Sequence, residues 1–510
     1  MGYLLGIDIG TSGTKTCLFR YDGELVTSAY AEYPMLQPQV GWAEQHPEDW
    51  WNATKQTIQM IFKQAKIKAS SIRGIGLSGQ MHGLVLVDRN GTVLRPAIIW
   101  CDQRTGQQVE WMRDSIGTEK IIELTSNTPL PNYTATKLLW VRDNEPTIYE
   151  KIHKVLLPKD YIRYKLTQEF ATEVSDASGT LLLDVASRKW SSKMVTLLGI
   201  ENDWLPEVRE SNQISGTVSK LAEIETGLAE GTAVVGGAGD QAAGAVGNGI
   251  VHAGVISATI GTSGVVFAST DEIKKDSLGR LHSFCHAVPG KWHVMGVTQA
   301  AGGSLQWFRN HFGLSEMEHA KSLQKDVYDI FSEKAMDVKP GSEGLVFLPY
   351  LMGERTPHLD SYAKGTFIGI TTRHGKEHFI RSIMEGVAFS LKDCLSLIDD
   401  LKIPNTEIRL SGGGAKSLVW RQIFADVFNQ KIHRIHANEG PAFGAALLAG
   451  VGTNIYSSVE EACSQTVKYY DAVEPTQEFV ERYEDYYTIY KELYFNLYET
   501  FSSLHKLAVK

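Results

Sequence analysis

The sequence has few cysteines, no excess of positive charge and no long apolar run. Its 510 residues include five cysteines, and no two of them have the spacing of a zinc or redox motif. Scattered cysteines in an odd number fit a reducing cytosol. The formal net charge is −9, without a basic block, which argues against nucleic acid and anionic membranes as main partners. An anionic substrate must then be held by local backbone donors or by a metal ion.

Targeting and membrane signals are also missing. The first residues form an apolar strand pattern without the segments of a secretory signal, and Gly6 stands where a myristoylation signal needs Ser or Thr. The Gly- and Ala-rich residues 234–260 are interrupted by polar side chains and do not suit a membrane span. We therefore expect a cytoplasmic protein, and its length predicts two domains rather than one core.

Two common nucleotide-binding motifs are either absent or present in the wrong structural context. The phosphate loop G-x-x-x-x-G-K-[ST] does not occur, and residues 412–417 only look like it. Residues 74–79 match the dinucleotide pattern G-x-G-x-x-G, but a strand pattern follows where that motif requires a helix. A near-match at residues 237–242 lacks an acidic residue between Asp240 and Asp271 to bind a ribose. A dinucleotide-dependent oxidoreductase is an alternative function that would depend on these two glycine patterns alone.

The sequence does contain a glycine-rich hairpin near its start. Two apolar strand patterns, residues 4–9 and 16–19, flank Gly-Thr-Ser-Gly at residues 10–13. The glycines permit a tight reversal, and the tip offers N–H groups, hydroxyls and the charge of Lys15 to an anion. Asp8 lies beside the tip, and a carboxylate next to a phosphate site indicates a cation such as magnesium between them. An ordinary hairpin with Asp8 as a turn residue is the alternative.

The same motif recurs about half the chain length later. Residues 261–264 repeat Gly-Thr-Ser-Gly letter for letter, and Thr259 takes the place of Asp8. One internal repeat at this spacing predicts two copies of one domain. Two facing hairpins would hold a polyphosphate from both sides. This arrangement resembles the actin-like ATPase superfamily, in which two related α/β domains enclose ATP in a cleft.

Asp240 is the leading candidate for an acid or base. It follows a glycine-rich strand pattern and precedes a helix of small residues. A helix cap is the simpler explanation, and capping would lower the pKa of the carboxylate. A carboxylate with a lowered pKa can still act as the base in phosphoryl transfer, because the base mainly orients the attacking hydroxyl. The loop of Gln80, Met81 and His82 offers polar donors and an apolar surface to a sugar, although a lone histidine is more often structural.

Two further glycine clusters are candidates for nucleotide contact. Residues 412–414 follow a strand pattern and would let a flat group such as adenine approach the backbone. Residues 302–306 begin a helix whose free N–H groups could meet phosphate or ribose. Tight packing explains each cluster as well. The C-terminal residues 477–504 form one amphipathic helix, whose aromatic stripe we interpret as packing.

These motifs together resemble the FGGY family of carbohydrate kinases. Residues 365–370 with 378–385 are similar to the C-terminal signature of the family, and residues 134–144 to the N-terminal one. Further stretches resemble bacterial members that phosphorylate D-xylulose: the Gln-Met-His loop and residues 156–161, 239–244, 282–287 and 348–351 with 353–357. Glycerol kinases of the family carry an Arg-Glu pair where Met81 and His82 stand here, which argues against glycerol.

The resemblance implies ATP-dependent conversion of D-xylulose to D-xylulose 5-phosphate, with Mg2+ as cofactor. It implies an α/β fold of two actin-like (ribonuclease H-like) domains. Residues 1–249 would bind the sugar and carry the first hairpin, and residues 250–510 would bind the nucleotide and carry the second hairpin and the C-terminal helix. Similar kinases are often dimers, so a homodimer is one expectation. Another ketose or polyol such as ribulose or gluconate, or a non-catalytic nucleotide switch, is the alternative.

The resemblance also implies residue roles. Asp240 would accept the proton of the terminal sugar hydroxyl and bind the sugar. Asp8 would be catalytic through the magnesium-bound phosphates, as a ligand of the metal either directly or through water. The other expected site residues are Gln80, Met81 and His82 for the sugar, and Thr11, Ser12, Lys15, Gly261, Thr262, Gly302, Gln306, Gly413 and Gly414 for ATP.

Overall fold

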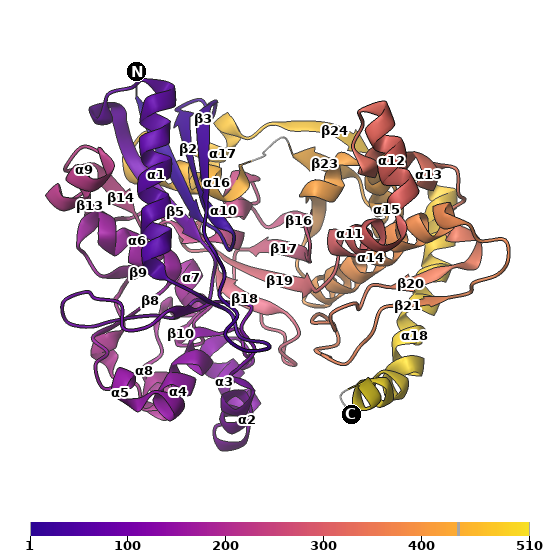
Figure 1. Cartoon of the computed structure of the whole chain (residues 1–510), viewed down its shortest axis with the longest axis horizontal. Coiled ribbons are helices and arrows are strands. Elements are labelled where there is room, and N and C mark those ends of the chain that lie inside the picture. The colour runs from indigo at the N-terminus through magenta and orange to yellow at the C-terminus, as the bar shows by residue number, and fades with distance from the viewer. Residues whose placement is uncertain (1, 436–438, 509–510) are drawn as a thin grey trace.

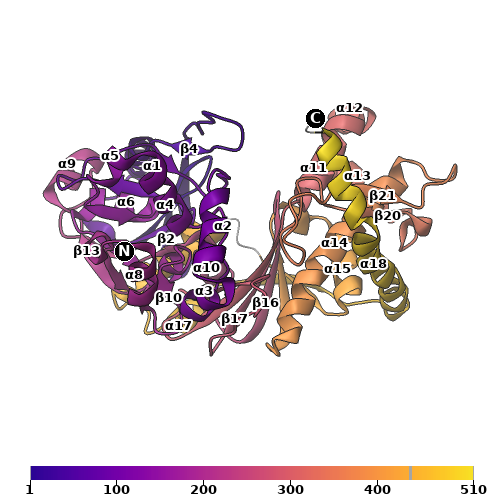
Figure 2. The same ribbon diagram turned by 90° about the horizontal axis from the view of Figure 1, so that it is seen from below.

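Two lobes make up the molecule, and each is built on a seven-stranded sheet (Figure 1). The computed structural model describes residues 2–435 and 439–508. Seen at right angles, the lobes lie side by side and are joined at one edge, near α10 (Asp240–Gly247), α17 (Val459–Thr466) and β16 (Gly254–Ile260) (Figure 2). The predicted α/β architecture of two related domains is confirmed.

The first sheet begins with the predicted hairpin. Its strand β1 pairs antiparallel with β2 and parallel with β5. Leu5, Ile7 and Ile9 alternate along β1 and are buried in the same core as the tryptophans of α1 (Pro47–Ala65), which is why the strand alternates in sequence. In order the strands are β13 (Ile214–Thr217), β14 (Ala233–Val235), β5 (Ile72–Gly79), β1 (Tyr3–Ile9), β2 (Gly13–Arg20) and β3 (Leu25–Glu32), and β15 (Ala238–Gly239) pairs with the end of β5.

The second sheet repeats this arrangement. Strand β16 pairs antiparallel with β17 and parallel with β22, as β1 does with β2 and β5. Asp8 stands opposite Ser78 in the first sheet, and Thr259 stands opposite Ser411 in the second. The repeat in sequence is therefore a repeat of topology. In order the strands are β18 (His282–Cys285), β19 (Trp292–Thr298), β17 (Gly264–Thr270), β16 (Gly254–Ile260), β22 (Asn405–Ser411), β23 (Ile432–Ile435) and β24 (Tyr469–Val473).

Packing does not follow a division of the chain at residue 249. Helices α16 (Gly440–Gly452) and α17 (Val459–Thr466) come late in the sequence but lie with the first sheet and α10 (Asp240–Gly247), as their colours show (Figure 1). The polypeptide crosses between the lobes from α10 to β16, from β23 to α16 and from α17 to β24. Residues of both halves of the sequence therefore build the joint between the lobes.

Helices complete both lobes. The C-terminal helix α18 buries Tyr483, Tyr487 and Tyr490 as expected, whereas Tyr498 is 49% exposed. Among the helices that the structure describes, none combines the length and the apolar character needed to cross a bilayer. Further helices of the two lobes are α4 (Thr134–Asn144), α7 (Val174–Ser178), α11 (Gly302–Phe312), α13 (Val327–Met336), α14 (Lys376–Asp400), α15 (Leu418–Phe428) and α18 (Gln477–Ala508).

Candidate active site

Asp240 borders a cavity between the two lobes. The cavity has a volume of about 250 Å³. Asp240 and other residues of α10 form one wall with the start of α16, and Thr259, Ser411 and Gly412 of the second lobe form the opposite wall. The carboxylate therefore faces the second copy of the repeat, at the position that corresponds to Asp8.

Strand pairing places Asp240 close to the first hairpin. Gly239 pairs with Gly79 of β5, and Gly79 pairs with Ile9 of β1, so the ends of these three strands lie together. The N–H of Gly239 donates to the hydroxyl oxygen of Ser175 at 3.1 Å. This bond holds Gly239, the residue before Asp240, against α7. It thereby fixes the backbone position from which the Asp240 side chain extends.

The surroundings of Asp240 favour its neutral form. Gly239 occupies the N-cap position and Asp240 is the first helical residue, so the capping explanation is wrong. Burial, followed by the negative charge of Asp8, raises the pKa of Asp240 to about 7. The side-chain amide of Gln241 donates to Asp240 Oδ1 at 3.3 Å. A carboxyl group with this pKa can take up and release a proton near neutral pH.

Asp8 is a half-buried residue whose carboxylate has spare hydrogen-bonding capacity. Burial raises its pKa, while the hydrogen bond from Ser78 and the charge of Lys15 act in the opposite direction. Within the described residues its Oδ1 has no partner. No group of three or more His, Cys, Asp or Glu side chains in that part of the chain forms a metal site. Asp8 thus fits an ion such as Mg2+ that arrives with phosphate and water ligands.

Lys15 lies between two carboxylates. It forms an ion pair with Glu439, the residue that precedes α16, and its side chain is 35% exposed. Its charge also acts on Asp8. A phosphate at the first hairpin would therefore compete with Glu439 for this ammonium group. The sequence pattern did not indicate Glu439, because more than four hundred residues separate it from Lys15.

Neighbouring loops brace the tip of the first hairpin. The side-chain amide of Gln80 donates to the carbonyl oxygen of Gly10 at 3.3 Å. The indole N–H of Trp100 donates to the hydroxyl of Thr11 at 2.9 Å, and Ser12 is exposed. The NH2 group of Gln80, a residue expected near the sugar, thus supports the hairpin, and its Oε1 has no partner within the described residues.

Met81 and His82 lie beside Asp240. A Cβ atom on Gly239 would come within 2.9 Å of Met81 Cγ, so Met81 packs directly against the residue before Asp240. Nδ1 of His82 donates to the carbonyl oxygen of Gly179 at 2.6 Å. Burial keeps the pKa of His82 well below its usual value, so the imidazole is neutral and its Nε2 is an acceptor.

Two residues of the same region were not expected from the sequence. Lys137 of α4 donates to the carbonyl oxygens of His82 and Asn132 at 2.8 and 2.7 Å, which holds the Met-His loop. Burial lowers the pKa of Lys137 to about 7. The ring of Tyr133 meets that of His82 edge-on at 5.1 Å. Lys137 falls in the stretch that resembles the N-terminal family signature, which was the available signal for it.

A second cavity, of about 400 Å³, lies within the second lobe. It brings together all the expected nucleotide residues of that lobe. Gly302 and Gly303 donate their N–H groups to the carbonyl oxygens of Gly261 and Thr262 at 2.8 and 3.0 Å. The expectation that these first N–H groups of α11 are free for phosphate is therefore wrong. The residues brought together are Gly261, Thr262, Gly302, Gln306, Gly413 and Gly414.

Two of the three glycines after β22, Gly413 and Gly414, have different surroundings. A Cβ atom on Gly414 would lie 2.5 Å from Ile260 Cγ2, so this glycine serves packing. A Cβ on Gly413 would meet nothing within 4 Å, so this glycine leaves space in the cavity. Tyr328, Met384 and Trp420 complete the wall from α13, α14 and α15. No sequence spacing connects these three helices, so no sequence pattern indicated these three side chains.

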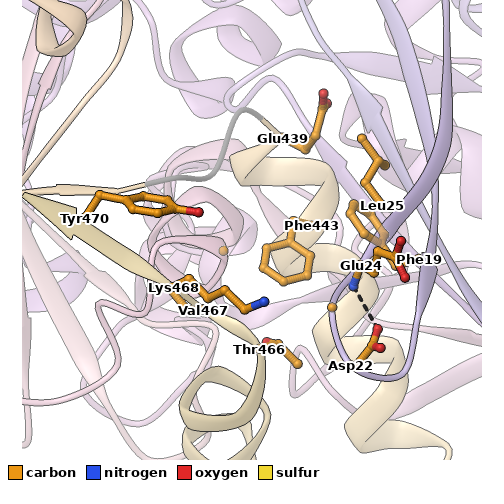
Figure 3. A pocket seen from close by; sticks show the side chains of 12 residues that line it. Phe19, Asp22, Glu24, Leu25, Glu439, Phe443, Thr466, Val467, Lys468 and Tyr470 are labelled. Carbon is orange, nitrogen blue, oxygen red and sulfur yellow. Dashed lines mark hydrogen bonds between the residues drawn. The ribbon is translucent and has the colours of Figure 1, made fainter.

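A third hollow, of about 420 Å³, marks the joint between the lobes (Figure 3). Asp22 and Glu24 lie on one side of it, and Phe443, Lys468 and Tyr470 on the other (Figure 3). The N–H of Glu24 donates to Asp22 Oδ1 at 3.0 Å. The hollow shares no lining residue with the two cavities described above. It lies where α17 leads into β24, beside one of the crossings between the lobes.

Comparison with known proteins identifies the family. Models of the N-terminal and C-terminal domains of the FGGY family of carbohydrate kinases match residues 3–247 and 256–453. Xylulose kinase of Bacillus subtilis (strain 168) is 38% identical over 495 residues, 97% of both chains, and gluconokinase of the same strain is 33% identical over 460 residues, 90% of this chain and 89% of that protein. The crystal structure of xylulose kinase from Rhodospirillum rubrum superposes with a TM-score of 0.90 at 29% identity, covering 98% of this chain and 100% of that one. The chain therefore belongs to the FGGY family of carbohydrate kinases.

Proposed function

We propose that this protein is a kinase that transfers the γ-phosphoryl group of ATP to D-xylulose, making D-xylulose 5-phosphate. Its similarity to xylulose kinases over nearly the whole chain supports the choice of substrate. One structural observation carries the mechanism: Asp240 faces a cavity that the repeated hairpin of the second lobe closes from the other side.

ATP would lie in the cavity of the second lobe. This cavity continues toward Asp240, because Ile260 and Gly413 line it while their sequence neighbours Thr259 and Gly412 line the cavity between the lobes. Gly261 and Thr262 would then hold phosphate from the second lobe. Thr11, Ser12 and Lys15 would hold it from the first. Mg2+, when bound with ATP, neutralises phosphate charge, and Asp8 would hold it directly or through water.

Asp240 would act as the base. Its carboxylate orients the C5 hydroxyl of the sugar toward the γ-phosphorus and accepts the hydroxyl proton as the new O–P bond forms. The bond between the γ-phosphorus and the bridging oxygen breaks, and ADP leaves. Met81 would cover the carbon chain of the sugar, and the acceptor Nε2 of neutral His82 would receive a sugar hydroxyl. Closure of the lobes would exclude water from this site.

The base assignment is tested by Asp240→Asn. We expect kcat on D-xylulose to fall by about 10²- to 10⁴-fold, because a positioned base contributes that much to proton transfer. The matched control is Asp485→Asn at an exposed aspartate of α18, which is expected to leave kcat unchanged. ADP release is measured in a coupled assay. Turnover of Asp240→Asn within a few-fold of the parent would show that another group is the base.

Gluconate is the second candidate substrate, because a gluconokinase is 33% identical to this chain. ADP release is measured with D-xylulose, ribulose and gluconate at equal concentrations. We expect kcat/KM for D-xylulose to exceed the others by at least about tenfold, since buried hydrogen bonds discriminate strongly between hydroxyl arrangements. A higher kcat/KM for gluconate would overturn the choice of substrate, and nucleotide binding without sugar-stimulated turnover would indicate a non-catalytic switch.

The same proposal includes a cytoplasmic location, where ATP is available, and a homodimer. Exposed aromatic side chains of α18 support a dimer, because Phe495 is 71% exposed and Tyr498 49%. Light scattering measures the mass in solution. A particle of one 56.5 kDa chain would contradict the dimer.

A further inference from the structure

Arg355 stands in the motif Gly-Glu-Arg-Thr-Pro, whose role the proposed mechanism does not use. The residues on both sides of it are fixed to the end of β19. Glu354 is buried, and its Oε1 accepts hydrogen bonds from the N–H groups of Gln299 and Arg355 at 2.9 and 2.7 Å. The N–H of Thr356 donates to the carbonyl oxygen of Val297 at 3.0 Å. Arg355 thus projects from a rigid support in the second lobe.

This support lies beside the sugar-binding region of the first lobe. The hydroxyl of Thr356 donates to the carbonyl oxygen of Arg280 at 2.8 Å, just before β18. His282 begins β18, and its Nδ1 is 2.7 Å from the hydroxyl of Tyr133. Tyr133 in turn contacts His82. A continuous set of contacts therefore leads from the loop of Arg355 to the Met-His loop.

The charge of Arg355 acts on this same region. Burial is the largest cause that lowers the pKa of His282 to about 3, and the positive charge of Arg355 is the second. The same charge also acts on Tyr133, His82 and Cys101. It is not among the groups that shift the pKa of Asp240. The charge of Arg355 thus acts on Tyr133, His82 and His282 rather than on Asp240.

In the described part of the chain the guanidinium of Arg355 also has no salt-bridge partner within contact distance, although the charge of Glu354 acts on it. Among residues 2–435 and 439–508, no ion pair or hydrogen bond of its side chain is present. The adjacent carboxylate, Glu354, is instead held by backbone N–H groups. A guanidinium offers a planar fork of N–H donors that matches two adjacent acceptor oxygens. An unpaired arginine on a rigid loop at a substrate site thus has free donors for a ligand.

We propose that Arg355 is a specificity-determining residue, which binds the two oxygens at C1 and C2 of the sugar, opposite the C5 hydroxyl that receives phosphate. This inference rests on the proposed function. The C2 carbonyl is an acceptor only, and a carboxylate at the corresponding end of a sugar acid would serve equally well. A polyol with a hydroxyl at C2 is a weaker acceptor. Because Arg355 comes from the second lobe, it would also couple sugar binding to closure.

The test compares Arg355→Met and Arg355→Lys with the parent, on D-xylulose and on its reduction product D-arabitol. We expect Arg355→Met to lower kcat/KM for D-xylulose by about 10- to 100-fold, the value of a hydrogen bond to a charged group, and that for D-arabitol by less than about threefold. Arg355→Lys should retain part of the preference, because a point charge replaces the fork. The KM for ATP should not change.

Arg373→Met is the matched control, since its side chain is 79% exposed in the same half of the chain. Equal losses on both sugars, or a higher KM for ATP, would overturn the proposal, and thermal unfolding checks that each variant is folded. Failure of the proposed function appears separately, as a parent that does not turn over D-xylulose. The same comparison is then made on gluconate and its reduced analogue sorbitol, where an unchanged preference overturns the role of Arg355.

Discussion

At the scale of single residues, burial alone does not identify a catalytic carboxylate. Burial raises the pKa of Glu354 to about 8 and that of Asp393 to about 7, close to the value for Asp240. Glu354 accepts backbone N–H groups, and Asp393 accepts the hydroxyl of Tyr487 at 2.7 Å. Asp240 instead borders a cavity, and its carboxylate accepts hydrogen bonds from its neighbour Gln241, from the side-chain amide at 3.3 Å and from the backbone N–H. A carboxylate that borders a cavity can reach a substrate and act as a base. A carboxylate that is enclosed by its hydrogen-bond donors has a structural role.

The pKa of Asp240 predicts how activity depends on pH. The free enzyme needs the ionised carboxylate, so kcat/KM for D-xylulose should fall about tenfold for each pH step below 7. The profile is measured from pH 5 to 9 in the coupled assay. A value that stays constant between pH 5 and 7 would contradict the assignment.

The same pKa predicts an effect on stability. The folded-state pKa of about 7 lies above the ordinary value of 3.8, so protonated Asp240 contributes stability that is complete below pH 4 and is lost as the pH rises through 7. Asn stays neutral, so Asp240→Asn should be more stable than the parent at pH 8, by at most about 4 kcal/mol, and equal to it at pH 4. Denaturant unfolding at both pH values measures the difference, and a variant less stable than the parent at pH 8 would refute this.

At the scale of elements, small residues decide how α10 and α16 pack. A Cβ atom on Gly444 would lie 1.8 Å from the carbonyl oxygen of Ala243, and one on Gly247 would lie 2.1 Å from that of Gly440. Backbone therefore touches backbone between the two helices. Gly6 and Gly76 provide similar room where α16 crosses β1 and β5. This close contact holds the helix that carries Asp240 against the first sheet.

Substitution in this contact should be costly. Gly444→Ala must displace one helix, and we expect it to lower the free energy of unfolding by about 1–3 kcal/mol. Gly106→Ala is the matched control, because it is also helical but a Cβ there meets nothing within 4 Å. Urea unfolding followed by circular dichroism measures both. Equal stability of the two variants would show that the helices separate without cost.

At the scale of the whole molecule, α10 connects the site to the joint between the lobes. Asp240 begins this helix, and beyond its end Arg409 of β22 donates to the carbonyl oxygens of Asn248 and Gly249 at 3.0 and 2.7 Å. The guanidinium also lies 4.1 Å from the ring of Tyr469 in β24. A cation at a helix C-terminus interacts favourably with the helix dipole. Arg409 therefore ties α10 to the second sheet.

Loss of this tie should impair closure. Arg409→Met leaves the apolar part of the side chain, and we expect a drop of about tenfold in kcat with a nearly unchanged KM for ATP. Small-angle scattering should show that the parent becomes more compact with D-xylulose and an ATP analogue, and that the variant does so less. Arg373→Met serves again as control. If both variants compact like the parent, Arg409 is not part of the joint.

Much of the fold was predictable from local patterns. The hairpin strands, the repeat at residues 261–264 and the helix after Asp240 depend on glycine conformations and on alternation over a few residues, which neighbours in the chain decide. The residues expected to contact the nucleotide in the second lobe also line one cavity. The contacts of the Gln80 and Lys15 side chains were less predictable, since each side chain has a partner far away in the sequence.

The sequence by itself determined two copies of a hairpin-led α/β domain and the candidate acid between them, because strand period, turn chemistry and internal repeats are properties of short segments. Only the tertiary structure decided that α16 lies on the first sheet, that Asp240 has a pKa near 7 and that the loop of Arg355 lies beside the start of β18. These features depend on burial and on contacts between residues distant in the chain, and no local pattern encodes either one.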